Sequence, residues 1–319
     1  MRIFVYGSIV YDRIMDFPDF FKDYILPNEI HNLNVSFMIN QLKESFGGTG
    51  GNIAYNLSLI KSKPLLYGSV GKDFEPYKKH FKNIDLTGVK THLKDFTASA
   101  YIITDKSNNQ ITGFHPGAMR YHTSKPKFKK DDLVIISPAN PNEMLDMAET
   151  CFKKNIPFIF DPGQQIIQFT KTQLKRVIKQ SSIYIVNDYE LALTVKLTGY
   201  SKDIILQKAG ILITTLGRKG SLIQVRDGKK VITYKIAPAK IKKVVDPTGA
   251  GDAFRSGLIK GLVDNKKYFL KKEYVKMPWL EIGQLASLTA VYALESYGTQ
   301  NHKYTLNNLK KRYKLNYKT

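Results

Sequence analysis

The chain has 319 residues, of which 43% are hydrophobic and 24% charged, a normal balance for a globular protein that excludes disorder as the overall state. No stretch approaches the roughly 20 consecutive apolar residues that a membrane helix needs, and the N-terminus lacks the apolar core and cleavage site of a signal peptide. Cys151 is the single cysteine, which excludes an internal disulfide and a cysteine metal site, so a reducing, cytoplasmic setting is expected.

The net charge of +22 is typical of proteins that bind nucleic acid or another polyanion. Here, however, the basic residues are mostly lysines scattered in short pairs such as Lys129-Lys130 and Lys266-Lys267, and no zinc-finger or RNA-binding pattern accompanies them. We therefore expect no nucleic-acid partner and no membrane partner. A positive field of this size should instead attract a small anionic substrate such as a nucleotide.

Apolar runs that are typical of strands alternate with helical patterns along the chain. The predicted strands cover residues 2–6, 64–70, 133–137, 157–160, 182–186 and 212–215, and the predicted helices cover 52–62, 142–154, 171–180, 188–197, 252–264 and 281–294. The turn signal at 226–228 predicts a hairpin between 221–225 and 231–236. This order predicts an α/β fold, with a parallel sheet covered by helices on both faces.

Two stretches depart from the β-α order. Residues 30–45 alternate weakly between apolar and polar side chains, and so do residues 98–104 and 110–114, which a turn at 105–109 joins as a hairpin. Half-apolar strands of this kind suit a small second sheet that covers a site. We expect one domain over residues 1–319, with a lid formed discontinuously by about 12–46 and 95–120.

The most specific motif is the string DPTGAGDAF at residues 246–254, where a helix is predicted to begin. The backbone N–H groups of Gly249, Ala250 and Gly251 would point to one spot at the positive end of that helix, which makes an anion site from main chain. Asp252 could take a proton from a hydroxyl that attacks the anion. Phosphoryl transfer needs both parts. The structural alternative is a glycine turn with Asp252 as a helix cap.

A second glycine cluster, GGTGGN at residues 47–52, opens the helix predicted at 52–62. It is either a flexible turn capped by Asn52 or a loop whose backbone and Asn52 amide bind a polar ligand such as sugar hydroxyls. The cluster is not a dinucleotide fingerprint, and the chain contains no Walker A sequence. These observations disfavour a P-loop kinase.

Two shorter motifs follow predicted strands. In TLGRKG at residues 215–220, the Thr215 hydroxyl, the glycine amides and Arg218 either surround a nucleotide phosphate or simply form a turn. In NDYE at residues 187–190, Asn187 either caps the next helix or, with Glu190, holds magnesium through water molecules. Ligands gather at the carboxyl ends of parallel strands, so we expect these motifs to share one site.

The four motifs, in this order, resemble those of the ribokinase family of sugar and nucleoside kinases, also called PfkB, and the resemblance spans essentially the whole chain. Within that family, the stretches 114–119, 161–165, 252–255 and 294–300 resemble adenosine kinases of the mycobacterial type. The resemblance implies a large α/β domain with a small β lid. It also implies transfer of the γ-phosphoryl group of ATP to the 5′-hydroxyl of adenosine, which gives AMP and ADP, with Mg²⁺ as cofactor.

The same resemblance assigns site residues in this sequence. Asp252 would be the general base, and the anion hole would be formed by the amides of Gly249, Ala250 and Gly251. The implied nucleoside-binding residues are Ser8, Asp12, Gly48, Asn52, Tyr101, Phe114, Gln164, Gln165 and Arg255. The implied ATP-binding residues are Asn187, Thr215, Gly217 and Gly220. Glu190 would hold Mg²⁺ through water, and a monovalent cation such as K⁺ would lie near Asp246, Thr248, Ser296 and Gly298.

In this reading, Asp12 would bind the ribose 2′- and 3′-hydroxyls, which selects ribose over deoxyribose. Phe114 and Tyr101 would stack on the purine, and Gln164 and Gln165 would read its polar edge. Base stacking and edge reading distinguish a nucleoside kinase from a free-sugar kinase, which needs neither. The alternatives are a kinase for guanosine, inosine or a free sugar, a non-catalytic nucleotide-binding protein, and a polyanion-binding protein. By analogy with the family, we expect a homodimer through the lid.

Overall fold

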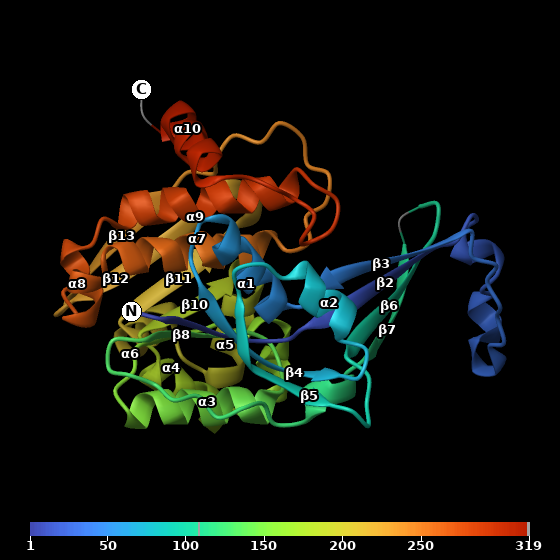
Figure 1. Ribbon diagram of the computed structural model, residues 1–319, viewed down its shortest axis with the longest axis horizontal. Helices are drawn as coiled ribbons and strands as arrows, with labels where there is room; N and C mark the ends of the chain where they lie inside the picture. Colours follow the sequence, from blue (N-terminus) through green and yellow to red (C-terminus); the bar gives the residue numbers. More distant parts are fainter. Residues whose placement is uncertain (108, 318–319) are drawn as a thin grey trace.

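Two β-sheets organise the computed structural model, which describes residues 1–107 and 109–317 (Figure 1). The larger sheet has nine strands in the order β13-β12-β11-β10-β9-β8-β1-β4-β5. They are β1 (Ile3–Tyr6), β4 (Pro64–Gly71), β5 (Asp85–His92), β8 (Leu133–Ile136), β9 (Phe158–Phe160), β10 (Ile183–Asn187), β11 (Ile211–Thr215), β12 (Ser221–Asp227) and β13 (Lys230–Ile236). The pairs from β5 to β11 are parallel, whereas β12 and β13 add an antiparallel hairpin. The predicted α/β class and hairpin are confirmed.

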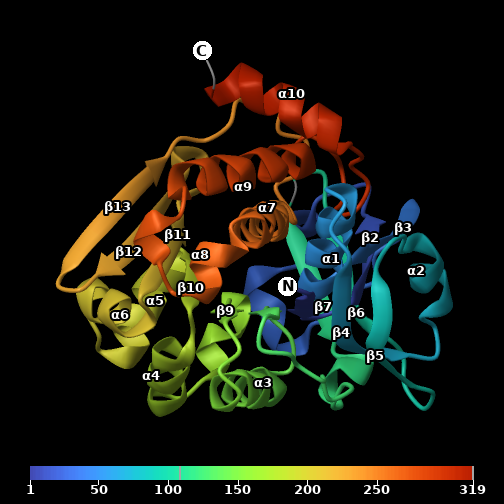
Figure 2. The same ribbon diagram turned by 60° about the vertical axis from the view of Figure 1, so that its left-hand side comes forward.

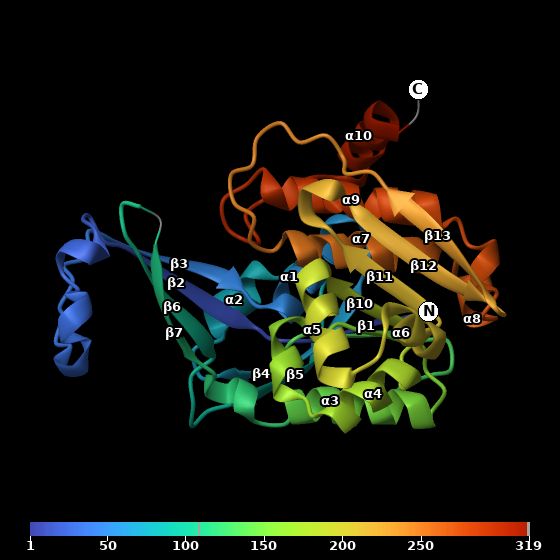
Figure 3. The same cartoon turned by 180° about the vertical axis from the view of Figure 1, so that it is seen from behind.

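Helices cover both faces of this sheet (Figures 2 and 3). One face carries α1 (Thr49–Leu59), α7 (Ala250–Asp264) and α9 (Trp279–Leu294), with α10 (Leu306–Tyr317) outside α9. The other face carries α3 (Pro141–Lys153), α4 (Lys171–Gln180), α5 (Asp188–Thr198) and α6 (Lys202–Ala209). Two short helices, α2 (Glu75–His80) and α8 (Lys266–Leu270), complete the helical layers.

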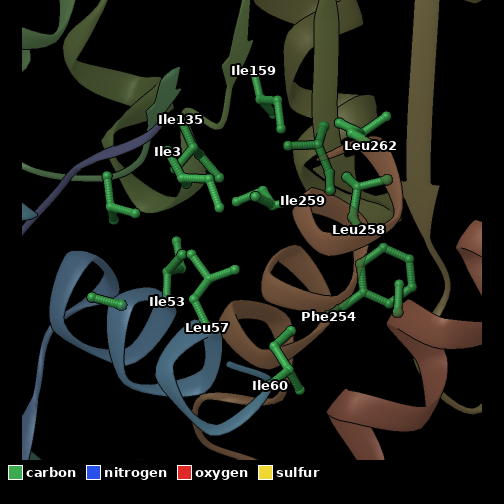
Figure 4. Packing of buried hydrophobic residues seen from close by; sticks show 14 of the residues in the cluster. Ile3, Ile53, Leu57, Ile60, Ile135, Ile159, Phe254, Leu258, Ile259 and Leu262 are labelled. Carbon is green, nitrogen blue, oxygen red and sulfur yellow. The ribbon is translucent and has the colours of Figure 1, made fainter. Parts of the chain in front are cut away.

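The alternation of side chains along buried strands divides the core into two clusters. Ile3 and Val5 of β1 face α1 and α7, whereas Phe4 and Tyr6 face the α3 side. Figure 4 shows the first cluster, in which Leu57 and Leu258 pack between the sheet and the neighbouring helices. Full burial of an aliphatic side chain contributes about 1.5–3 kcal/mol. These contacts pack α1 and α7 over this face of the sheet.

The smaller sheet has the order β3-β2-β6-β7 and extends to one side of the larger one (Figure 1). Its strands are β2 (Val10–Asp16), β3 (Gln41–Gly47), β6 (Ala98–Thr104) and β7 (Gln110–His115). It is built from two excursions of the chain, one between β1 and α1 and one between β5 and β8. We call this sheet the lid. In the turn predicted at 105–109, Asn108 lies outside the described residues.

Several elements differ from the prediction. β2 and β5 were not predicted, because Asp12, Arg13 and the polar ends of 85–92 weaken the apolar pattern of these half-exposed strands. Residues 33–39 are not a strand. Instead Phe37 packs against Phe17 and Phe21, with ring centroids 4.7 and 5.2 Å apart, in a segment that holds the 3-10 helices η1 (Phe21–Asp23) and η2 (Pro27–Asn32).

Four short or terminal helices were also not predicted from the sequence: α2, α6, α8 and α10. Their patterns are brief or rich in lysine, and tertiary packing decides such segments. Within the described residues, no helix is long and apolar enough to cross a membrane.

Candidate active site

The loop before α7 is fixed by Asp246. Its two carboxylate oxygens accept hydrogen bonds from the backbone N–H groups of Thr248 (2.8 Å) and Gly298 (2.9 Å). Gly249 follows with φ = 76°, a left-handed conformation that favours glycine, and stands at the N-cap of α7. The first amides of a helix lack acceptors within the helix. Here they open toward a cavity, although the N–H of Ala250 also makes a long hydrogen bond of 3.4 Å to Pro247 O.

A cavity of about 940 Å³ lies at the carboxyl ends of β9, β10 and β11, beside the N-terminus of α7. It brings together many of the predicted site residues, namely Gly249, Ala250, Gly251, Asp252, Arg255, Gln164, Asn187, Glu190, Thr215, Gly217 and Gly220. The remaining predicted residues lie outside its lining: Ser8, Asp12, Gly48, Asn52, Tyr101, Phe114, Gln165, Asp246, Thr248, Ser296 and Gly298. The cavity therefore unites the motifs predicted for the base, the anion hole and the nucleotide.

Asp252 stands in the first turn of α7 and lines this cavity. Its Oδ2 accepts a hydrogen bond of 2.8 Å from Asn52 Nδ2. Burial raises the pKa of Asp252 to about 7, while the Arg255 guanidinium and the Asn52 amide act in the opposite direction. A carboxyl group with a pKa near neutrality can both accept and release a proton at physiological pH.

Arg255 is buried one turn further along α7 and forms an ion pair with Asp161, which follows β9 directly. Arg255 Nη2 donates to Asp161 Oδ1 at 2.7 Å, and Nη1 donates to Gly251 O at 2.9 Å. The guanidinium thus joins the end of β9 to the anion-hole loop. The sequence motifs assign no role to Asp161, although an acidic residue directly after a predicted buried strand is a signal for one.

Asn187 and Glu190 form a reciprocal capping box at the start of α5. Asn187 Oδ1 accepts from Glu190 N at 2.7 Å, and Glu190 Oε2 accepts from Asn187 N at 2.8 Å. The structural alternative of the sequence reading, a helix cap, is therefore present. Both side chains also line the cavity, and burial raises the pKa of Glu190. Capping and a ligand role are compatible, because the cap uses one carboxylate oxygen.

The residues predicted to bind ribose lie near Asp252. In this structure, Ser8 and Asn52 use their side chains for hydrogen bonds within the protein. Ser8 Oγ accepts from Thr49 N at 3.0 Å and so caps α1, which begins three residues earlier than predicted, at Thr49, after Gly48. Asn52 is held by Asp252. Asp12 lies in β2, where burial and the charge of Asp246 raise its pKa to about 6. A ribose role for these residues stays a prediction.

The register of the lid separates the two aromatic residues predicted to stack on a base. Asp12 pairs with Ala100, which pairs with Phe114, so Asp12 and Phe114 share one face. Tyr101 pairs with Arg13 and lies on the opposite face, where its hydroxyl accepts from Arg13 Nη1 at 3.1 Å. The charge of Asp12 acts to raise the pKa of Asp252, so the two carboxyl groups lie near each other. The prediction that Tyr101 stacks on the purine together with Phe114 is thus corrected, because the register puts the two rings on opposite faces of the lid.

The remaining predictions concern the residues expected to contact the polar edge of the purine and the residues expected to bind cations. In η4 (Gly163–Gln168), Gln164 lines the cavity and Gln165 does not. The donor set at the candidate cation site includes Asp246, whose oxygens already accept two amides. Among residues 1–107 and 109–317, no three His, Cys, Asp or Glu side chains gather closely enough to hold a metal ion.

Two further residues, Gln300 and Tyr77, lie behind Asn52, and the sequence analysis did not place either of them near Asp252. Gln300 Nε2 donates to Asn52 Oδ1 at 2.9 Å, and Tyr77 lies on the other side of Gln300. Gln300 stands in the matched stretch 294–300, and the family resemblance placed it only with Ser296 and Gly298 near the monovalent cation. Tyr77 lies in α2, which gave no motif.

The fold and the site define a class of enzyme, a phosphotransferase that uses an alcohol as acceptor. A comparison with protein families agrees: the pfkB family carbohydrate kinases match residues 2–305. The chain belongs to this family. Its fold is ribokinase-like, with the nine-stranded sheet as the large layer and the four-stranded sheet as the lid, as predicted from the resemblance.

The relatives of this chain include nucleoside kinases. The chain is 32% identical to a nucleoside kinase of Methanocaldococcus jannaschii over 275 residues, which cover 84% of this chain and 85% of that protein. It is 34% identical to the solved structure of Burkholderia thailandensis nucleoside kinase in complex with inosine, with a TM-score of 0.83 and coverage of 99% and 98%. The ADP-inosine complex of that enzyme gives 35% identity, a TM-score of 0.80 and coverage of 99% and 96%. These relatives support the family, and not specifically the mycobacterial type of adenosine kinase.

Proposed function

We propose that the protein transfers the γ-phosphoryl group of ATP to the 5′-hydroxyl of a purine nucleoside, with adenosine as the predicted acceptor and inosine or guanosine as the alternatives. The observation that carries the proposal is the position of Asp252. Its carboxyl group lies in the first turn of α7, beside the helix N-terminus, in a cavity that a nucleotide could enter. The relatives named above, one of them solved with inosine, support a nucleoside as the acceptor.

The cavity has a composition suited to ATP. Apolar side chains line one part of it, among them Ile241, Val244 and Leu294, and such surfaces suit a flat base. Thr215 and Asn187 line the part nearer to the sheet, where hydroxyl and amide groups can bind phosphate oxygens. With the adenine among the apolar residues, the triphosphate would lead toward the N-terminus of α7.

The acceptor would bind between this cavity and the Asp12 face of the lid. Asp12 offers a carboxylate for the ribose diol, and Phe114 on the same face offers a ring for stacking on the base. Gln164, which lines the cavity, offers an amide that can both donate to and accept from a purine edge. An acceptor without a base would leave Phe114 without its stacking partner.

The proposed reaction is a single phosphoryl transfer from ATP to the nucleoside. Asp252 accepts the proton of the 5′-hydroxyl, the 5′-oxygen bonds to the γ-phosphorus, and the bond from that phosphorus to the β–γ bridging oxygen breaks. The electron pair leaves with ADP, and the nucleoside monophosphate forms. The amides of Gly249, Ala250 and Gly251 would stabilise the negative charge on the γ-phosphoryl oxygens, helped by the dipole of α7.

Mg²⁺ would accompany ATP, and the donors present fit it. The carboxylate of Glu190 lines the cavity, and its Oε2 accepts a hydrogen bond from the backbone N–H of Asn187. Its Oε1 is therefore suited to a water-mediated contact with a hard cation. Bound Mg²⁺ would neutralise phosphate charge. A monovalent cation would use Asp246, Thr248, Ser296 and Gly298 and would stiffen the loop that carries the anion hole.

The test is a panel of adenosine, inosine, guanosine, cytidine and ribose with MgATP, followed by ADP release and mass spectrometry of the products. We expect 5′-monophosphates of purine nucleosides and the highest kcat/KM with adenosine. A higher kcat/KM with inosine or guanosine would replace adenosine and keep the reaction. Preferred phosphorylation of ribose, or no ADP release with any acceptor, would overturn the proposal.

We also retain the homodimer through the lid as a proposal. β7 is exposed at every position, and its outer edge pairs with no other strand in the described part of the chain. An unpaired edge of this kind is a template for another strand. Sedimentation equilibrium tests the proposal: a single species with the mass of one chain at micromolar concentration would contradict it.

A further inference from the structure

A continuous series of buried hydrogen bonds leads from Asp252 to the base of the lid. Asn52 Nδ2 donates to Asp252 at 2.8 Å, and Asn52 Oδ1 accepts from Gln300 Nε2 at 2.9 Å. Gln300 Nε2 also donates to the hydroxyl of Tyr77, which donates at 2.7 Å to Gly47 O. Gly47 is the last residue of lid strand β3. Gln300 and Tyr77 are 2% and 0% exposed, so water does not compete for these bonds.

The direction of each bond follows from the one before it. The single proton of Tyr77 goes to Gly47 O, so the Tyr77 oxygen is left to accept from Gln300. Gln300 therefore turns its NH₂ group toward both Tyr77 and Asn52. Asn52 must then present its oxygen to Gln300 and its NH₂ group to Asp252. A flipped Asn52 would bring oxygen against oxygen at Asp252 and NH₂ against NH₂ at Gln300.

The space around this series is closed on the side of α1. A Cβ atom on Gly51 would lie 2.2 Å from the Tyr77 hydroxyl oxygen and 3.2 Å from Gln300 Nε2. The glycine next to Asn52 is thus required by the approach of these two side chains. This gives the glycine cluster at residues 47–52 a purpose that does not involve direct contact with a ligand.

The segment after α9 holds the same region from a second direction. Thr299 Oγ1 donates to Phe46 O in β3 at 2.8 Å, and Gly298 N donates to Asp246 at 2.9 Å. Residues 298–300 therefore contact the end of a lid strand, the loop before α7 and, through Asn52, the base. In the sequence, this segment follows the first turn of α7 by more than 40 residues.

We propose that Gln300 and Tyr77 are positioning residues for Asp252, acting through the Asn52 amide; this rests on the proposed function, in which Asp252 is the general base. The Asn52 N–H group occupies Oδ2 and leaves Oδ1 to take the proton of the acceptor. It also favours the ionised carboxylate, because a hydrogen bond to the charged form stabilises that form. Without Gln300, Asn52 loses the bond that fixes its orientation, and Asp252 loses both effects.

The principal variant is Gln300→Met, which keeps the length of the side chain and removes its NH₂ group. We expect kcat to fall by about 10- to 100-fold, as for loss of a hydrogen bond to a charged group, and KM for ATP to change by less than twofold. The acid limb of the kcat–pH profile should move up by about one pH unit. A merely structural role would lower the melting temperature and leave that limb in place.

A matched pair of tyrosines supplies the control. Tyr77 and Tyr55 are both buried, and each donates at 2.7 Å to a backbone carbonyl, Gly47 O and His302 O respectively. Tyr77→Phe removes the acceptor of Gln300 and should move the acid limb in the same direction by a smaller amount. Tyr55→Phe loses an equivalent bond outside the series and should leave the limb unchanged.

A direct titration separates this inference from the proposed function. The carboxyl carbon of Asp252, labelled with ¹³C and assigned by its loss in Asp252→Asn, reports the pKa whatever the acceptor is. We expect a higher pKa in Gln300→Met and Tyr77→Phe than in the wild type and in Tyr55→Phe. Equal pKa values in folded wild type, Tyr77→Phe and Tyr55→Phe would overturn the positioning role, even if Gln300→Met did not fold. An inactive wild type with the expected shifts would instead overturn the proposed function.

Discussion

The carboxyl edge of the large sheet and the lid hold their side chains in opposite ways. At the edge, Asp252 is half-buried and Arg255 and Asp161 are buried, and all three are linked to neighbouring elements by hydrogen bonds or an ion pair. In the lid, Phe114 and Tyr101 are 48% and 42% exposed. Groups that carry out chemistry must be oriented before the substrate arrives. Groups that recognise a substrate can remain exposed in the free protein and become buried when the substrate binds. Substitutions at the edge should therefore change kcat, and substitutions in the lid should change KM.

The largest expected effect belongs to Asp252→Asn, which removes the base while keeping the shape of the side chain. We expect kcat to fall by about 10² to 10⁴, the usual contribution of a positioned base, with nearly unchanged nucleoside affinity by calorimetry. Asp264→Asn is the control, because Asp264 lies at the other end of α7 in an exposed pair with Lys260. Near-normal turnover in Asp252→Asn would remove Asp252 from its role.

The pH dependence of kcat comes next in size. Burial raises the pKa of Asp252 to about 7, and only the deprotonated carboxylate can accept the hydroxyl proton. Activity should therefore rise as the pH passes through about 7 and fall roughly tenfold per unit below it. Initial rates under saturating substrates between pH 5 and 9 measure this profile, with the melting temperature followed in parallel. A flat profile between pH 5 and 7 would contradict the assignment.

Phe114→Ala tests the lid side of the comparison. Stacking of a base on an aromatic ring contributes about 1–3 kcal/mol, so KM for the nucleoside should rise by about 10-fold or more while kcat changes little. KM for ATP serves as the internal control. A loss confined to ATP, or a fall in kcat alone, would show that the lid does more than recognise the acceptor.

The smallest effect is expected for Tyr101→Ala, which sharpens the distinction between the two faces of the lid. Tyr101 faces away from Asp12 and contacts Arg13. We expect less than a twofold change in KM for the nucleoside. An increase as large as that of Phe114→Ala would return Tyr101 to the nucleoside site.

The order of the elements and the contents of the cavity were predictable from the sequence because both depend on local patterns. A buried parallel strand is a short apolar run, and glycines before an amphipathic helix mark a close approach of backbone to ligand. Asp252, Asn187 and Thr215 stand directly at such boundaries, so the residues at 246–254, 187–190 and 215–220 could be brought to one edge without a structure.

The faces on which the lid side chains lie, and the hydrogen bonds that support Asp252, were not predictable in this way. Whether Tyr101 or Ala100 shares a face with Asp12 depends on strand register, and a shift of one residue reverses the faces. The partner of Asn52 is 200 residues away in sequence, and Gln300 is 248 residues from Asn52. No local pattern marks such contacts, so the sequence analysis assigned Asn52 to ribose and did not predict its hydrogen bond to Asp252.

The lid departs from the body and returns to it twice, between β1 and α1 and again between β5 and β8. Neither excursion contains the loop before α7, the capping box of α5 or the turn after β11. Under the proposed function, Asp12 and Phe114 lie in these excursions and would contact the acceptor, so much of the acceptor site could diverge while the ATP-binding motifs stay the same. If the two excursions are replaced by those of a relative that prefers another acceptor, we expect the acceptor preference to change. The residues predicted to bind ATP would stay as they are.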